Sequence, residues 1–87
     1  MDGYNFSVPS GWNFQQTIDA IVQAENAVAE FQGFTAAELQ SPMQSRELHA
    51  ATPHDALTKL RYLAPVGAIR NYDVELLPSL YRLRVRS

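Results

Sequence analysis

Residues 72–86, YDVELLPSLYRLRVR, decide the fold class, because this segment fits both a helix and a strand. A helix over 74–84 would align its apolar residues Val74, Leu76, Leu77, Leu80 and Leu83. The second half, Leu80 to Arg86, instead alternates apolar and basic residues as a strand does. Pro78 lies five residues after Asp73, a suitable N-cap, and so falls near the first turn, where proline costs less than in mid-helix. We favour the helix and expect an all-α domain.

A helix over residues 13–32 is predicted from the spacing of apolar residues. They recur at steps of three and four, on one helical face, at Phe14, Ile18, Ile21, Val22, Val28 or Ala29, and Phe31. Asn13 is the expected N-cap, with Gln16 three residues later. Gly33 is the expected stop, because glycine readily adopts the left-handed conformation that ends many helices.

A second helix is expected over residues 36–50, bent near residue 41. Thr35 and Glu38 have the spacing of a capping box, flanked by a hydrophobic staple. Pro42 prevents an undisturbed helix, but Ser41 followed by Pro42 is itself a helix start signal. We therefore expect this helix to be short or bent at Ser41.

A further helix over 53–64 completes the expected fold. Thr52 is its expected N-cap, Pro53 its first residue and Pro65 its end. Residues 1–12 are expected to be an irregular arm, or to contain a short extended segment, since Pro9 and Gly11 interrupt them and no helical period is present. The 87 residues are thus expected to form one compact domain of three or four helices. The expected core consists of Phe14, Ile18, Ile21, Val22, Phe31, Leu39, Leu57, Leu60, Leu63, Leu76, Leu80 and Leu83.

Composition limits the chemistry that this chain can perform. The absence of cysteine excludes disulfides, thiolate metal sites and a cysteine nucleophile. His49 and His54 are separated by Pro53, which breaks any shared helical face, so we expect no metal site. The glycines are scattered, without phosphate-loop spacing, and no serine has a Gly-x-Ser-x-Gly setting. We therefore expect a protein that is not an enzyme and needs no cofactor.

Charge is divided unevenly along the chain. Residues 1–45 carry five acidic and no basic residues, whereas all seven basic residues come later, against four acidic ones. The two halves either balance each other or form a bipolar surface that steers a charged partner. Asp2 stands where a signal peptide would carry a cation, and no apolar run has transmembrane length. We expect a cytoplasmic protein that is not inserted in a membrane.

The expected partner-binding residues lie at the two ends of the sequence. Arg82, Arg84 and Arg86 follow the aromatic Tyr81. Such a terminal group is most often a solvated face or pairs with acidic residues of the first predicted helix, here Asp19, Glu25 or Glu30. It also suits a protein surface or, alternatively, nucleic acid. An isoelectric point of about 5.5 is opposite to the usual footprint of a nucleic-acid binder. Trp12 precedes the first helix and either seals the core or anchors an interface, and we favour sealing.

Two segments, ATPHDALTKLRYL at 51–63 and YDVELLPSL at 72–80, resemble a loose group of small uncharacterised helical proteins of bacteria and their prophages. The shared features are the Ala-Thr-Pro helix start and the Lys-Leu-Arg-Tyr-Leu run, which are capping and core residues. The resemblance covers less than half of the chain and implies no site residues. It implies a setting in which small accessory proteins bind host or phage proteins, anti-CRISPR inhibitors among them. A small nucleic-acid-associated regulator is the alternative function, and a homodimer is one expected state because the core is small.

Overall fold

The computed structural model describes residues 3–86 and shows a mixed α/β fold, so the all-α prediction is wrong. In chain order the elements are β1 (Tyr4–Ser7), α1 (Phe14–Ala24), β2 (Val28–Gln32), α2 (Ala36–Leu39), β3 (Glu47–Ala50), α3 (Pro53–Lys59), the 3₁₀ helix η1 (Leu60–Leu63), β4 (Tyr72–Leu77) and β5 (Leu80–Val85).

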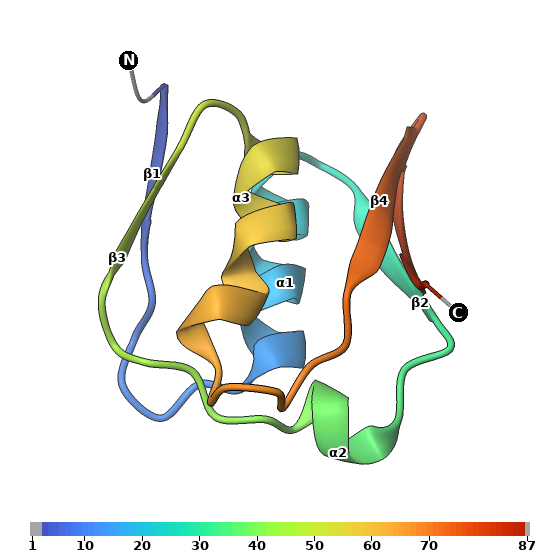
Figure 1. Ribbon diagram of the computed structural model, residues 1–87. Helices are drawn as coiled ribbons and strands as arrows, with labels where there is room; N and C mark the ends of the chain where they lie inside the picture. Colours follow the sequence, from blue (N-terminus) through green and yellow to red (C-terminus); the bar gives the residue numbers. More distant parts are fainter. Residues whose placement is uncertain (1–2, 87) are drawn as a thin grey trace.

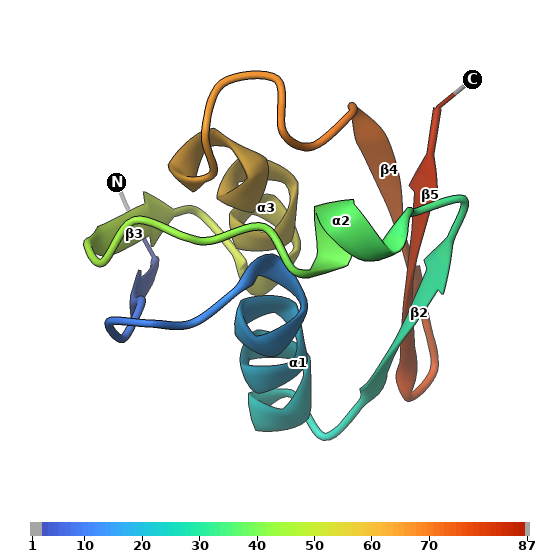
Figure 2. The same cartoon turned by 90° about the horizontal axis from the view of Figure 1, so that it is seen from below.

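These elements form three layers, with α1 and α3 between two small sheets (Figure 1; Figure 2). One sheet pairs β1 with β3 in antiparallel orientation. The other has the strand order β2-β5-β4, in which β5 is parallel to β2 and antiparallel to β4. The helices therefore cover one face of the three-stranded sheet and leave its other face open.

The helix start signals at Asn13, Thr35 and Thr52 were predicted correctly, whereas the one at Ser41 was not. Asn13 and Gln16 form a capping box at the start of α1, with Gln16 N–H donating to Asn13 Oδ1 at 2.8 Å. Thr35 and Glu38 form a second box at α2. Thr52 caps α3, where its Oγ1 accepts from the N–H of Asp55 at 3.0 Å. The predicted helix over 53–64 is confirmed, as α3 followed by η1.

The predicted helix over 13–32 is too long. It ends at Ala24, and Asn26 then takes a left-handed φ of 58°, which turns the chain back into β2. Gly33 does have a positive φ of 81°, but it follows a strand and not a helix. Pairing of 28–32 with β5 outweighs their helical spacing.

The predicted bent helix over 36–50 is also wrong beyond its first turn. Ser41 and Pro42 start no helix, because the Ser41 carbonyl accepts from Phe14 N–H at 2.9 Å and Pro42 forms a bridge with Asn13. Residues 47–50 are β3, which pairs with β1. Within the predicted arm, Tyr4–Ser7 form a strand, which agrees with the alternative of a short extended segment, while residues 1 and 2 lie outside the described part.

The predicted helix over 74–84 is a β-hairpin. Leu77 and Leu80 are paired across a two-residue turn, Pro78-Ser79. Proline suits the second position of such a turn, and Ser79 has the positive φ, 60°, that the third position of a type II turn needs. The alternation over 80–86 was the correct signal.

Burial agrees with much of the predicted core. Phe14, Ile18, Ile21, Val22, Leu57, Leu60, Leu63 and Leu83 are buried, whereas Phe31, Leu39 and Leu80 are half-buried. Leu76 is 60% exposed, because it lies in β4 next to the hairpin turn and not on a helix. Trp12 packs against the core, as predicted. No helix within residues 3–86 is both long and apolar enough to cross a membrane.

The buried carboxylate of Glu38, in α2, is bonded to the segment that precedes β4, which in turn is bonded to the residue after β2. Glu38 is only 5% exposed and accepts from Thr35 N–H, from Arg70 N–H at 2.9 Å and from Arg70 Nη2 at 2.7 Å. Arg70 Nη2 also donates to the Gly33 carbonyl at 2.7 Å. These bonds connect the segment after β2 to the segment before β4, on the two sides of β5 in the strand order. The hydrogen bond from the Arg70 guanidinium lowers the pKa of Glu38 to about 2.

Replacing Thr52 by Ala should lower the free energy of unfolding by about 1 kcal/mol, because the cap of α3 is lost. Thr52→Asn, which can still cap, is the matched control and should retain most of the stability. Chemical denaturation gives both values. Equal stabilities for wild type and Thr52→Ala would show that the cap does not stabilise α3.

Replacing Glu38 by Gln should lower the melting midpoint at neutral pH, because Gln lacks the charge that Arg70 stabilises. A lowered folded-state pKa stabilises the fold above the ordinary value of 4.5, and this contribution is lost as pH falls toward about 2. The difference in melting midpoint between wild type and Glu38→Gln should therefore become smaller as the pH is lowered from 4.5 toward about 2. Thermal unfolding followed by circular dichroism measures it, with exposed Glu75→Gln as control. A difference that stays constant with pH would contradict the assignment.

Candidate functional site

The open face of the three-stranded sheet carries three rows of side chains, which we call the outer sheet face. The rows run across β2, β5 and β4 and consist of Val28, Leu80 and Leu77; Glu30, Arg82 and Glu75; and Gln32, Arg84 and Asp73. Alternate residues of a strand point to opposite faces, so residues of β5 such as Tyr81 and Leu83 face the helices. The hairpin thus sorts its residues into a core side and a solvent side.

The charges of the outer sheet face are paired. Arg82 donates from Nε to Glu30 at 2.9 Å and from Nη1 to Glu75 at 3.0 Å. Arg86 Nη2 lies 2.6 Å from Asp73 Oδ1. Hydrogen bonds from these arginines hold the pKa values of Glu30 and Asp73 below their ordinary values. Arg86, the next outward-facing residue after Arg84, also belongs to the outer sheet face, so its three arginines face the three carboxylates Glu30, Glu75 and Asp73 and the face has no net charge.

The third arginine completes the pattern. Arg84 donates from Nε to Gln32 Oε1 at 2.8 Å and lies opposite Asp73 in the register. Each of the three arginines is thus bound to a neighbouring strand, and exposed pairs of this kind contribute little to stability. Their effect is to make a flat, ordered polar surface.

The end of the sheet at the hairpin turn is apolar. Val28 is 62% exposed and Leu76 is 60% exposed, while Leu77 and Leu80 are half-buried. We call these four residues the apolar end. Val28, Leu80 and Leu77 form one row of the outer sheet face, and Leu76 emerges on the opposite side of the same end. The charged row of Glu30, Arg82 and Glu75 borders it directly.

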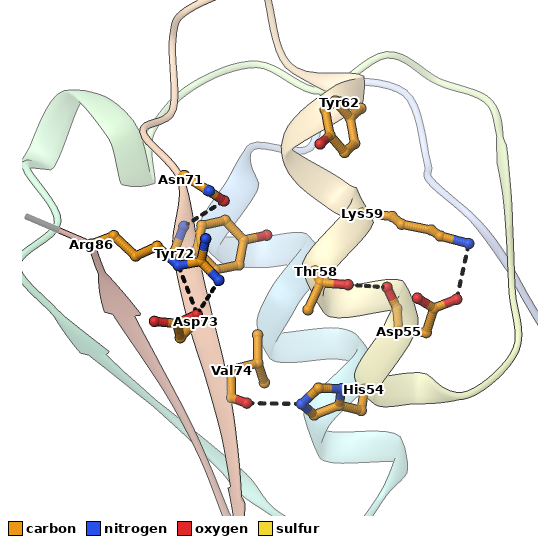
Figure 3. Close-up of a pocket in the computed structure, with 10 residues that line it drawn as sticks. All are labelled: His54, Asp55, Thr58, Lys59, Tyr62, Asn71, Tyr72, Asp73, Val74 and Arg86. Carbon is orange, nitrogen blue, oxygen red and sulfur yellow. Dashed lines mark hydrogen bonds and ion pairs between the residues drawn. The ribbon is translucent and has the colours of Figure 1, made fainter.

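A groove of about 490 Å³ lies between α3 and β4 (Figure 3). It is lined by His54, Asp55, Thr58, Lys59, Tyr62, Asn71, Tyr72, Asp73, Val74 and Arg86. One end is closed where His54 Nε2 bonds the Val74 carbonyl at 2.8 Å. Figure 3 shows Thr58 and Lys59 on the helix side, opposite Asp73 and Arg86 on the sheet side.

The cations of the groove are also paired. Lys59 Nζ lies 2.9 Å from Asp55 Oδ2, and Arg86 is bound to Asp73. The backbone N–H of Ala51 and the side chain of Lys59 hold the pKa of Asp55 below its ordinary value. The groove therefore attracts neither anions nor cations strongly. Asp73 and Arg86 belong to both the groove and the outer sheet face.

The structure brings only some of the predicted binding residues together. Arg82, Arg84 and Arg86 share one side of β5. Tyr81 is 7% exposed and packs in the core on the other side, so it does not join them. Trp12 lies before α1, outside the sheet, and contacts the core. His49 and His54 bond Asn5 and Val74 respectively, and no cluster suited to a metal occurs within residues 3–86.

Glu30 was among the carboxylates expected to pair with the arginines, and Arg82 does bind it, but Asp73, Glu75 and the groove were not predicted from the sequence. A usable signal was present around Pro78 and Ser79, because Asp73 and Glu75 are placed symmetrically to Arg84 and Arg82 about that turn. Opposite charges at mirror positions around a Pro-Ser pair are typical of a hairpin. The groove has no such signal, since it depends on how α3 packs against β4. The chain matches no protein-family model, no curated protein and no solved structure.

Replacing Tyr72 by Phe should lower the free energy of unfolding by about 1–2 kcal/mol. The buried Tyr72 hydroxyl donates to the Leu57 carbonyl, and its loss leaves that carbonyl without this donor. Burial also raises the pKa of Tyr72. Chemical denaturation measures the change, and Tyr62→Phe, at a residue that is 68% exposed, is the control. If both variants were equally stable, the hydroxyl would not tie α3 to β4.

Proposed function

We propose that the protein is a non-catalytic accessory protein of phage or prophage type that binds a host or phage protein. The observation that carries the binding function is the apolar end, where Val28 and Leu76 are more than half exposed. Exposed apolar groups bordered by charged residues are typical of protein interfaces, which combine an apolar centre with a polar rim. The row of Glu30, Arg82 and Glu75 supplies such a rim.

Charge pairing favours a protein partner over nucleic acid. A phosphate contact would require Arg82 to leave Glu30 and Glu75, or Arg86 to leave Asp73. Nucleic-acid affinity depends on a surplus of positive charge, and the outer sheet face has none. A protein surface can instead pair with both signs and gain specificity from the pattern.

The biological setting rests on the resemblance of residues 51–63 and 72–80 to phage and prophage proteins. In this fold those residues form α3, η1 and most of the hairpin. The all-helical architecture that the resemblance implied therefore does not apply to this chain. Inhibition of a host defence protein, in the manner of an anti-CRISPR, is the specific role that this setting suggests. It stays a prediction, as does the cytoplasmic location.

Replacing Val28 by Glu should weaken partner binding at least about tenfold, since a charge enters an apolar contact. Affinity capture from a bacterial host lysate and from phage-infected cells, followed by mass spectrometry, identifies the partner. Titration calorimetry with the purified partner then gives the affinities. Val66→Glu is the matched control, because Val66 is fully exposed on another surface. Unchanged binding by Val28→Glu would rule out the apolar end as the interface.

Two further measurements separate the alternatives. Sedimentation of the purified protein tests whether a second copy occupies the apolar end, in which case Val28→Glu would convert a dimer into a monomer. Binding of wild type to random duplex DNA at physiological salt, lost when Arg82, Arg84 and Arg86 are changed to Gln, would favour the nucleic-acid alternative.

A further inference from the structure

β4 is an edge strand whose free side faces the groove. The N–H of Arg86 donates to the carbonyl of Asn71 at 3.0 Å, which fixes the hydrogen-bonding alternation of the antiparallel pair. Residues 71, 73 and 75 therefore direct their backbone groups toward β5. The backbone groups of Tyr72, Val74 and Leu76 point the other way, past α3. Tyr72 and Val74 both line the groove.

Side chains already bond two of these edge groups. Asn71 Oδ1 accepts from the N–H of Tyr72 at 3.1 Å, and His54 Nε2 donates to the carbonyl of Val74 at 2.8 Å. An amide oxygen and a ring N–H thus occupy the positions that the carbonyl and N–H of a neighbouring strand would take. Such side-chain caps are one way in which proteins protect an exposed edge.

The Tyr72 carbonyl and the Val74 N–H remain, and no described residue bonds either of them. They flank Asp73. In a parallel pair, a residue of the added strand bonds the two neighbours of the residue opposite it. Its N–H donates to the carbonyl of the preceding neighbour, and its carbonyl accepts from the N–H of the following neighbour. A single peptide residue opposite Asp73 therefore bonds both free groups without displacing a side chain. A longer peptide would replace the bond of Asn71 to the Tyr72 N–H at one end, and the bond of His54 to the Val74 carbonyl at the other, with backbone bonds of its own.

The groove also specifies the chemistry of its occupant. Its charges are paired, so recognition through a strongly acidic or basic segment is not favoured. A helix has its backbone groups bonded internally and cannot satisfy the edge. An extended peptide can, and addition of a strand beside a helix is a recurrent mode of peptide binding. The free edge of β2, at Ala29 and Phe31, does not line this groove.

We propose that the groove binds an extended, uncharged segment of the partner protein, which adds to the sheet as a strand parallel to β4. This inference rests on the proposed protein-binding function and names the structural element that the partner contributes. Asp73 and Arg86 connect the groove to the outer sheet face, so one partner can contact both.

A phage-displayed library of random linear peptides is the probe. Selection on the wild-type protein should yield peptides that form extended strands, and binding should shift the amide resonances of Tyr72, Val74 and Leu76. Cross-strand nuclear Overhauser contacts next to Asp73 should show the parallel orientation. Failure to select any peptide, or shifts confined to the outer sheet face, would overturn the proposal.

Val74→Pro removes the free N–H from the edge without removing a bond to β5, and should weaken the selected peptides at least about tenfold. Ala29→Pro is the matched control, since it removes an outward N–H from β2 and should leave the affinity unchanged. If Val74→Pro unfolds, Thr58→Arg serves instead, because it fills the groove from α3 and leaves β4 intact. Full affinity in the folded groove variant would contradict strand addition.

The same variants separate this inference from the proposed function. If the captured partner binds Val74→Pro and Thr58→Arg as tightly as wild type but not Val28→Glu, strand addition is wrong and protein binding stands. If wild type captures no partner and sedimentation shows no dimer that Val28→Glu disrupts, the proposed function fails, even if peptides bind the groove.

Discussion

The rest of the structure depends on the ion pair between Glu38 and Arg70. A carboxylate that is 5% exposed is costly to bury unless its charge is compensated, and the capping box with Thr35 leaves it only one orientation. Arg70 must therefore lie beside Glu38, and its second contact, with the carbonyl of Gly33, holds the residue that follows β2. One pair thus sets where β2 ends and where β4 begins. A break there would release both edges of the sheet together.

The two surfaces described above arise from the same layer arrangement. Helices α1 and α3 cover one face of the sheet, so the other face must be compatible with solvent, and its paired charges meet that need. α3 lies beside β4 without pairing with it, which leaves a groove along that edge. The molecule thereby offers a flat face and a linear edge that share Asp73 and Arg86. A partner that uses both would be held in position by two different kinds of contact.

Local signals in the sequence identified every helix start that the described residues contain, with one false start at Ser41, but they did not identify strand pairing. Asn13, Thr35 and Thr52 were identified because a cap is bonded to residues two or three positions away. Residues 28–32 failed because their apolar residues also fit a helix, and their pairing partner is about fifty residues distant in the chain. Residues 80–85 failed although their hairpin partner is adjacent, because the helical spacing was given more weight than the strand alternation. The arginines of the candidate site were found from local sequence. Asp73 and Glu75 could have been found from their mirror positions about the hairpin turn, whereas the groove depends on tertiary packing, which spacing alone does not encode.

The order of strands has a consequence for synthesis on the ribosome. β5 lies in the centre of its sheet, yet it is translated after both strands that flank it. Until β5 emerges, β2 has no strand to pair with, and the apolar groups of Phe14, Ile18 and Ile21 have no sheet to cover. β2 and β4 therefore cannot join into one sheet until β5 has been made, and a truncation that stops before residue 80 would leave a chain unable to close its main sheet.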